Sequence, residues 1–200
     1  MIVPSRALAL TALLALAACS GEAAPPDGEG TASVPAIDMP TAAASTPAIA
    51  LPDPSDPNTL TPTGLGVVRV GTPPPQNGPS AWTKDDVTLS DTCQTWHANA
   101  YPDAYLMTDG SAVRRVTVAQ SSPVRTGKGI GVGDSEAQVM KAYPDAVASP
   151  HKYVAAPAKY LDAIPADGEA GLRFEIDQDG KVSMIHAGIM PWLGYVEGCA

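Results

Sequence analysis

Residues 172–185 read LRFEIDQDGKVSMI, and this stretch decides the fold class. Apolar residues occupy alternate positions on both sides of its centre: Leu172, Phe174, Ile176, Val182 and Met184. A period of two is typical of strands that bury one face. Between them, Asp177–Gly180 contains the residue types that tight turns require. The stretch therefore predicts an antiparallel hairpin.

A helix is predicted upstream of this hairpin. Ser135 and Gln138 have the spacing of a capping box, in which each side chain satisfies a free amide of the first helical turn. Apolar residues recur at helical spacing near one face: Ala137, Val139, Met140 and Tyr143. Pro144 then ends the helix.

Both segments have counterparts earlier in the chain. Gly64–Gly71 matches Gly127–Gly133, and the pair Ala104–Gly110 and Val113–Val118 matches the hairpin. Pro73–Pro75 follows the first glycine segment, and prolines at these positions argue against a regular helix there. The matches indicate an internal duplication whose first copy has lost or shortened its helix.

The predicted fold is an α+β domain over residues 61–200, with an antiparallel sheet, few helices and two related halves at about 61–124 and 125–200. Gly133–Val139, followed by the hairpin, resembles the repeat unit of the β-lactamase-inhibitory-protein fold and of the SmpA/OmlA outer-membrane lipoproteins. In those families a helical element packs on an antiparallel sheet. The resemblance implies that the domain binds another protein.

The first nineteen residues indicate export. Residues 1–18 fit a signal peptide, because their apolar run, Ala7–Ala18, is too short to span a bilayer. Leu16-Ala17-Ala18-Cys19 resembles the lipobox of bacterial lipoproteins. The resemblance implies that Cys19 carries a lipid anchor with fatty acyl chains such as palmitate, and Ser20 after it resembles the signal for the outer membrane. The alternative is an ordinary signal peptide with a chance cysteine.

Residues 19–60 predict a disordered tether. They are rich in Ala, Pro, Ser and Thr and contain no aromatic residue, so they cannot bury enough apolar area to fold. Residues 20–60 also hold six acidic residues and no Lys or Arg. The whole chain has a formal net charge of −9 at pH 7 and no basic patch, which argues against a nucleic-acid partner.

Two cysteines remain for the folded domain. The chain has three, and lipidation of Cys19 would leave Cys93 and Cys199 as an even pair in an oxidising compartment. We therefore predict a disulfide between them. The alternative is two separate buried thiols.

The glycines before the predicted helix raise the possibility of a phosphate-binding loop. Lys128 precedes the glycines, whereas a Walker loop needs a lysine after its last glycine. Gly129, Gly131 and Gly133 are two apart, which places them on one face of an extended strand and does not fit a dinucleotide fingerprint. Asp134 at the helix entrance would repel a phosphate. We therefore expect no nucleotide ligand.

Other catalytic and metal-binding patterns are also missing from the sequence. His97, His151 and His186 lack the spacing of a zinc site, so we expect neither a metal nor a cofactor. No serine stands in a G-x-S-x-G elbow, and we assign no catalytic residue.

The strongest candidates for recognition lie in loops: His151, Lys152, Tyr153, Trp192 and Tyr195. Tyrosine and tryptophan offer a large contact area with few torsions, which is why binding surfaces favour them. For Trp192 and Tyr195 the alternative is a place in the core beside the disulfide.

The sequence thus predicts a lipid-anchored lipoprotein at the outer membrane, facing the periplasm. Its domain is expected to bind another protein or an envelope component, without catalysis. The alternative is a hydrolase of envelope polymers that uses carboxylates of the 172–186 hairpin region, such as Glu175 and Asp177. A purely structural envelope protein is a third possibility.

Overall fold

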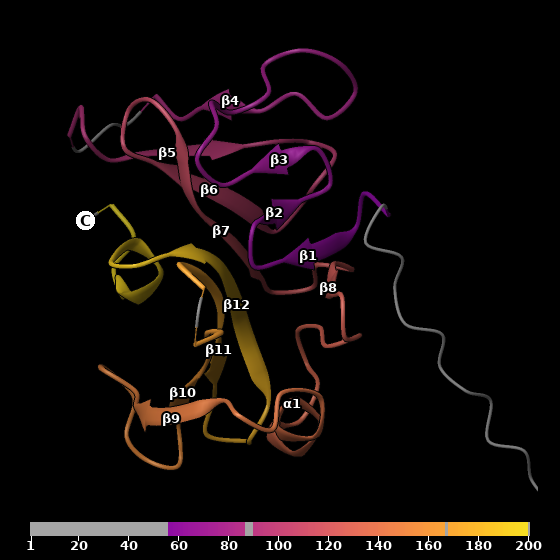
Figure 1. The fold of residues 1–200 in the computed structure, drawn as a ribbon, viewed down its shortest axis with the longest axis vertical. Helices are drawn as coiled ribbons and strands as arrows, with labels where there is room; N and C mark the ends of the chain where they lie inside the picture. The colour runs from indigo at the N-terminus through magenta and orange to yellow at the C-terminus, as the bar shows by residue number, and fades with distance from the viewer. Residues whose placement is uncertain (1–55, 87–89, 167, 200) are drawn as a thin grey trace, which may run out of the picture. The chain divides into compact units, whose positions relative to one another are not determined.

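The computed structural model describes residues 56–86, 90–166 and 168–199, and Figure 1 shows their arrangement. The expected signal peptide (1–18), the lipidation residue Cys19 and nearly all of the expected tether (19–60) lie outside the described residues. None of the helices in the described ranges is long and apolar enough to cross a membrane.

An eight-stranded antiparallel sheet forms the larger part of the fold. In spatial order its strands are β4 (Thr83–Lys84), β5 (Gln94–His97), β6 (Ala104–Thr108), β7 (Val113–Ala119), β12 (Val182–Ile189), β11 (Ala170–Ile176), β10 (Lys159–Ala163) and β9 (Val147–Pro150). Strands β4–β7 are neighbours in chain order, and so are β9–β12. The last strands of the two series, β7 and β12, pair at the centre of the sheet.

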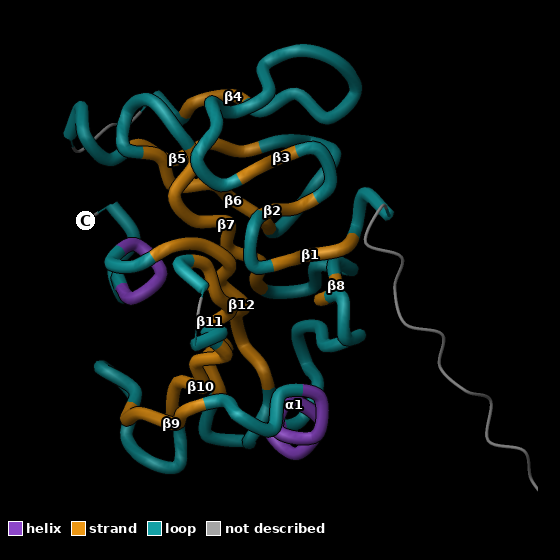
Figure 2. Tube along the Cα trace, viewed as in Figure 1, coloured by secondary structure: helices purple, strands orange, loops and turns teal. Residues whose placement is uncertain are grey.

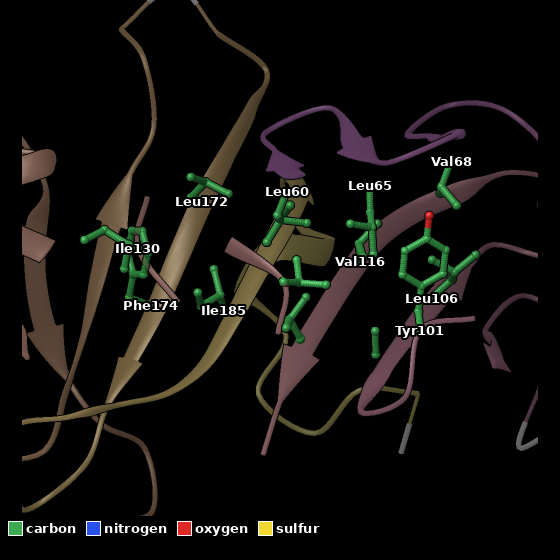
Figure 3. Close-up of a cluster of buried hydrophobic side chains, with 14 of the residues drawn as sticks. Leu60, Leu65, Val68, Tyr101, Leu106, Val116, Ile130, Leu172, Phe174 and Ile185 are labelled. Atoms are coloured by element: carbon green, nitrogen blue, oxygen red, sulfur yellow. The ribbon is translucent and has the colours of Figure 1, made fainter. Parts of the chain in front are cut away.

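A second sheet of four short strands has the order β3-β2-β1-β8. These strands are β1 (Thr59–Thr61), β2 (Gly64–Leu65), β3 (Val68–Arg69) and β8 (Arg125–Thr126). Figure 3 shows Leu60 and Leu65, from β1 and β2, pointing toward Val116 on β7. Leu60, Leu65 and Phe174 belong to one buried cluster, so the core lies between the small sheet and the apolar face of the large one.

The predicted helix is confirmed as α1 (Glu136–Ala142). Ser135 caps it, because the Gln138 amide donates to Ser135 Oγ (3.3 Å) and the Ser135 amide donates to Gln138 Oε1 (2.9 Å). Val139 is fully buried against the sheet, whereas Ala137 is exposed, so the expected apolar face is narrower than the spacing suggested. In the first half, the described residues between β3 and β4 form a loop, as Figure 2 shows.

The hairpin that decides the fold class is formed by β11 and β12. Its register shifts between Glu175 and Ile176, so Ile185 pairs with Phe174 and is buried, while Met184 pairs with Glu175. The expected alternation of Val182 with Met184 is therefore wrong by one residue, because a β-bulge moves Met184 to the opposite face. A bulge of this kind leaves no mark in a pattern of apolar residues.

The glycine segment before α1 is a series of turns. Gly129 and Gly133 have φ values of +82° and +86°, so the expectation of an extended strand is wrong. Asp134 Oδ2 accepts from the Gly131 amide and from Arg125 Nη1, both at 2.9 Å. The Asp134 carboxylate thus satisfies the Gly131 amide within the same loop.

Candidate recognition site

The face of the large sheet opposite the core carries polar side chains. Because side chains alternate between faces, partners in register share a face across neighbouring strands. One such row crosses six strands: His97, Tyr105, Thr117, His186, Arg173 and Asp162. We call this surface the polar face.

A chain of hydrogen bonds runs through the polar face. Thr117 Oγ1 lies 2.8 Å from His186 Nδ1, and His186 Nε2 lies 2.9 Å from Glu175 Oε1. On the other side, His151 Nε2 lies 3.4 Å from Glu175 Oε2. Glu175 is therefore the shared acceptor of two imidazoles.

Burial sets the protonation state of His186, and hydrogen bonds set that of Glu175. It lowers the pKa of His186, so the ring is neutral at pH 7 and acts on Glu175 as a hydrogen-bond donor. Burial alone would raise the pKa of Glu175, but the hydrogen bonds from His186 and His151 outweigh it and the pKa is lowered. The carboxylate is accordingly charged at neutral pH.

A hydroxyl, an imidazole and a carboxylate in this order could act as a nucleophile, its general base and the group that orients the base. However, Thr117 is fully buried, so no substrate reaches its hydroxyl. Glu175 has both oxygens bound to histidines, and Asp177 Oδ1 accepts from the amides of Asp179 (2.9 Å) and Lys181 (2.8 Å) in the turn. These contacts favour structural roles for both carboxylates.

The C-terminal segment crosses the polar face. We call residues 190–199 the C-terminal strap; its central turn, η1 (Trp192–Gly194), contacts β7, β11 and β12. Arg115 Nη1 donates to the carbonyls of Trp192 (3.3 Å) and Tyr195. Arg173 Nη1 donates to the carbonyl of Gly194 (3.1 Å). Two arginines from the sheet thus hold the strap against it.

The predicted disulfide is present between Cys93 and Cys199. It links the end of the strap to the residues just before β5, in the first half of the chain. The strap is therefore held by a covalent bond at its end and by arginine hydrogen bonds along its length.

An open hollow of about 640 Å³ lies beside the disulfide. Its walls come from Ser90 and Cys93, from Lys152 and Tyr153, and from residues 194–199 of the strap. Tyr153 is 59% exposed. The hollow is open enough for a side chain or a short peptide segment of a partner.

The five candidate recognition residues are divided by the structure. Lys152, Tyr153 and Tyr195 line the hollow, and the Trp192 ring lies 5.4 Å from that of Tyr195. Tyr195 is 41% exposed and Trp192 half-buried, so neither is in the core. The His151 ring instead turns inward, to Glu175.

No group of three or more His, Cys, Asp or Glu side chains in residues 56–86, 90–166 and 168–199 could hold a metal ion. His97 lies near the β4 edge of the sheet, with its Nδ1 2.7 Å from Asp85 Oδ1. His151 and His186 share Glu175. The three histidines thus lie in two separate places.

Sequence reasoning missed Arg115 and the hydrogen bonds of the polar face. The signal was present, because Arg115 and Thr117 alternate with Val116 and Val118 along β7. That alternation predicts a polar outer face, but not that a distant segment covers it.

Comparisons of the chain with protein-family models, with curated proteins and with solved structures gave no match.

Proposed function

We propose that the protein is an exported, lipid-anchored binding module. Cys19 carries the lipid, the residues between Cys19 and the start of the domain near β1 form the tether, and the domain recognises another protein or an envelope component at the periplasmic side of the outer membrane. The hollow beside the disulfide, with Tyr153 and Tyr195 on its rim, is the binding surface in this proposal.

One observation carries the binding role: three segments far apart in the sequence meet around this hollow. Ser90 and Cys93, Lys152 and Tyr153, and the C-terminal strap converge there. A cation and two partly exposed aromatic rings around a concave surface are typical of protein recognition sites. The disulfide keeps the strap in place before a partner arrives, which limits the ordering entropy of binding.

We also propose that the two halves of the domain arose by duplication. The strand order supports this, because β4–β7 and β9–β12 are two meanders that meet at their last strands. Gly133–Val139 at the start of α1 adds the resemblance to the β-lactamase-inhibitory-protein fold. The first half has a loop between β3 and β4 where the second half has α1, as Pro73–Pro75 predicts.

The lipid anchor is tested by Cys19→Ala. Cells fed a labelled fatty acid are expected to label the wild-type chain and not the variant, because the cysteine sulfur is the attachment atom. Cys93→Ala keeps Cys19 and serves as the control; it should keep its label. Label that persists on Cys19→Ala would refute the anchor.

The binding surface is tested by a photo-crosslinking residue placed at 153 or 195 in the full-length chain. Both positions are expected to give the same crosslinked product, because both side chains line one hollow. Val67, which is 64% exposed on another part of the domain, is the matched control. Tyr195→Ala should then weaken crosslinking through position 153, since loss of one central aromatic lowers affinity by about 30-fold. Equal products from all three positions would contradict the proposal.

A further inference from the structure

His151 lies at the start of the connection between β9 and β10, which also carries Lys152 and Tyr153. Its ring stacks on that of Tyr160, with centroids 4.6 Å apart, and Nε2 faces Glu175 at 3.4 Å. The ring is therefore held by side chains of β10 and β11, whereas the backbone of His151 leaves the sheet.

The other ring nitrogen holds the loop. The backbone amides of Tyr153 and Val154 both donate to His151 Nδ1, each at 3.2 Å. A nitrogen that accepts two N–H donors cannot carry a proton itself. The ring is therefore in the neutral form with its proton on Nε2, where it donates to Glu175.

We infer that His151 is a proton-sensitive catch, which holds Tyr153 and Val154 when the ring is neutral and releases them when Nδ1 takes up a proton. Imidazoles in general change charge between about pH 5 and 8. A proton from solvent on Nδ1 would face two N–H donors, so both backbone hydrogen bonds break. The protonated ring keeps its Nε2–H on Glu175. The loop thus opens while the ring stays in place.

Titratable and charged side chains near His151 come from each neighbouring element: Glu175 and Arg173 on β11, Tyr160 on β10, His186 on β12 and Lys152 in its own loop. Lys159, the next residue to Tyr160 on β10, instead donates to Glu136 on α1 (2.8 Å). The Lys152 amide also donates to Tyr160 Oη (3.3 Å), so the loop keeps one anchor when it opens.

The consequence for recognition rests on the proposed binding role of the hollow. Tyr153 is two residues from the catch and lines that hollow. Release of its amide removes the constraint that places its ring there. Binding through this surface should therefore weaken as pH falls from 8 to 5.

The test is NMR relaxation on the full-length chain with Cys19→Ala, which carries no lipid attachment residue. Between pH 8 and pH 5, the order parameters of the Tyr153 and Val154 amides should fall from about 0.85 to below about 0.6, with the same midpoint as the His151 ring. His151→Asn should keep both amides ordered throughout, because an asparagine oxygen accepts amides two and three residues on and has no proton to gain. His97→Asn, at an exposed histidine, should leave the wild-type response unchanged.

Amides that stay ordered, without exchange broadening, while the His151 ring titrates would overturn the catch. So would a His151→Asn chain whose amides still respond to pH. Crosslinking from position 153 at pH 8 and pH 5 separates the two proposals. If the amides loosen but crosslinking is absent at both pH values, the catch stands and the proposed binding surface fails.

Discussion

Replacing both cysteines of the bridge with serine, as Cys93→Ser and Cys199→Ser, is expected to lower the free energy of unfolding by about 4–5 kcal/mol. The bridge joins residues separated by 106 positions. In the chain-entropy treatment, a loop of about this length restricts the unfolded chain by that amount. Urea unfolding followed by tryptophan fluorescence should show a lower midpoint.

The same variant should loosen the C-terminal strap before the rest of the domain. Without the bridge, the strap keeps the hydrogen bonds that Arg115 and Arg173 donate to its carbonyls, but its end is free. Chymotrypsin should therefore cut after Trp192 or Tyr195 much faster than in the wild type, while the sheet stays intact.

Cys19→Ala is the matched control, because it removes a cysteine outside the bridge and should leave the midpoint unchanged. Two results would contradict this account of the disulfide. One is a midpoint in the double variant equal to that of the wild type, and the other is free thiols at Cys93 and Cys199 in the native protein.

The local elements that the sequence predicted depend on short-range chemistry. The capping box at Ser135, the hairpin around Asp177–Gly180 and the loss of a helix after Pro73 each follow from neighbours within a few residues. The bulge of β12, opposite Glu175 and Ile176, was missed because the alternation of apolar residues does not mark it. The pairing of β7 with β12 could not be predicted from the sequence, since partners about 70 residues apart carry no local signal.

The site was predictable only in part. Loop residues with aromatic rings and a cation indicated Lys152, Tyr153 and Tyr195, and these line one hollow. His151 has the same sequence context, yet its ring turns inward because Glu175 and Tyr160 offer it a hydrogen bond and a stacking partner. A one-dimensional pattern cannot tell which of two adjacent side chains meets such partners.

Glu175→Ala is expected to lower the free energy of unfolding by about 3–4 kcal/mol at pH 7. The side chain is 13% exposed and is the acceptor for both His186 and His151. Its negative charge also offsets Arg115 and Arg173 on the same face. Removing one partner of a buried charged network leaves the others uncompensated, which costs about 3–5 kcal/mol. Urea unfolding at pH 7 measures the change.

Glu169→Ala, the same replacement at an exposed carboxylate just before β11, is the control for that measurement. It should change the free energy of unfolding by no more than about 0.5 kcal/mol. Equal losses in Glu169→Ala and Glu175→Ala would assign the effect to net charge and refute the role of the network.

The network also makes stability depend on pH, with the same sign from two groups. Burial lowers the pKa of His186 below its ordinary 6.5, so the unfolded chain binds the proton first and stability falls as pH drops below that value. The pKa of Glu175 is lowered from its ordinary 4.5, because hydrogen bonds from the histidines outweigh burial. Its contribution is complete above about pH 4.5 and is lost as pH falls through the folded-state pKa.

Unfolding midpoints between pH 8 and pH 3 should therefore decline in two steps in the wild type. Glu175→Gln should keep the first step, which belongs to His186, and reduce the second, because an amide does not titrate in this range. Part of the second step should remain, because hydrogen bonds also lower the pKa of Asp109. A wild-type chain as stable at pH 4 as at pH 7 would contradict the buried neutral imidazole. A second step of full size in Glu175→Gln would assign the acid sensitivity to carboxylates outside the polar face.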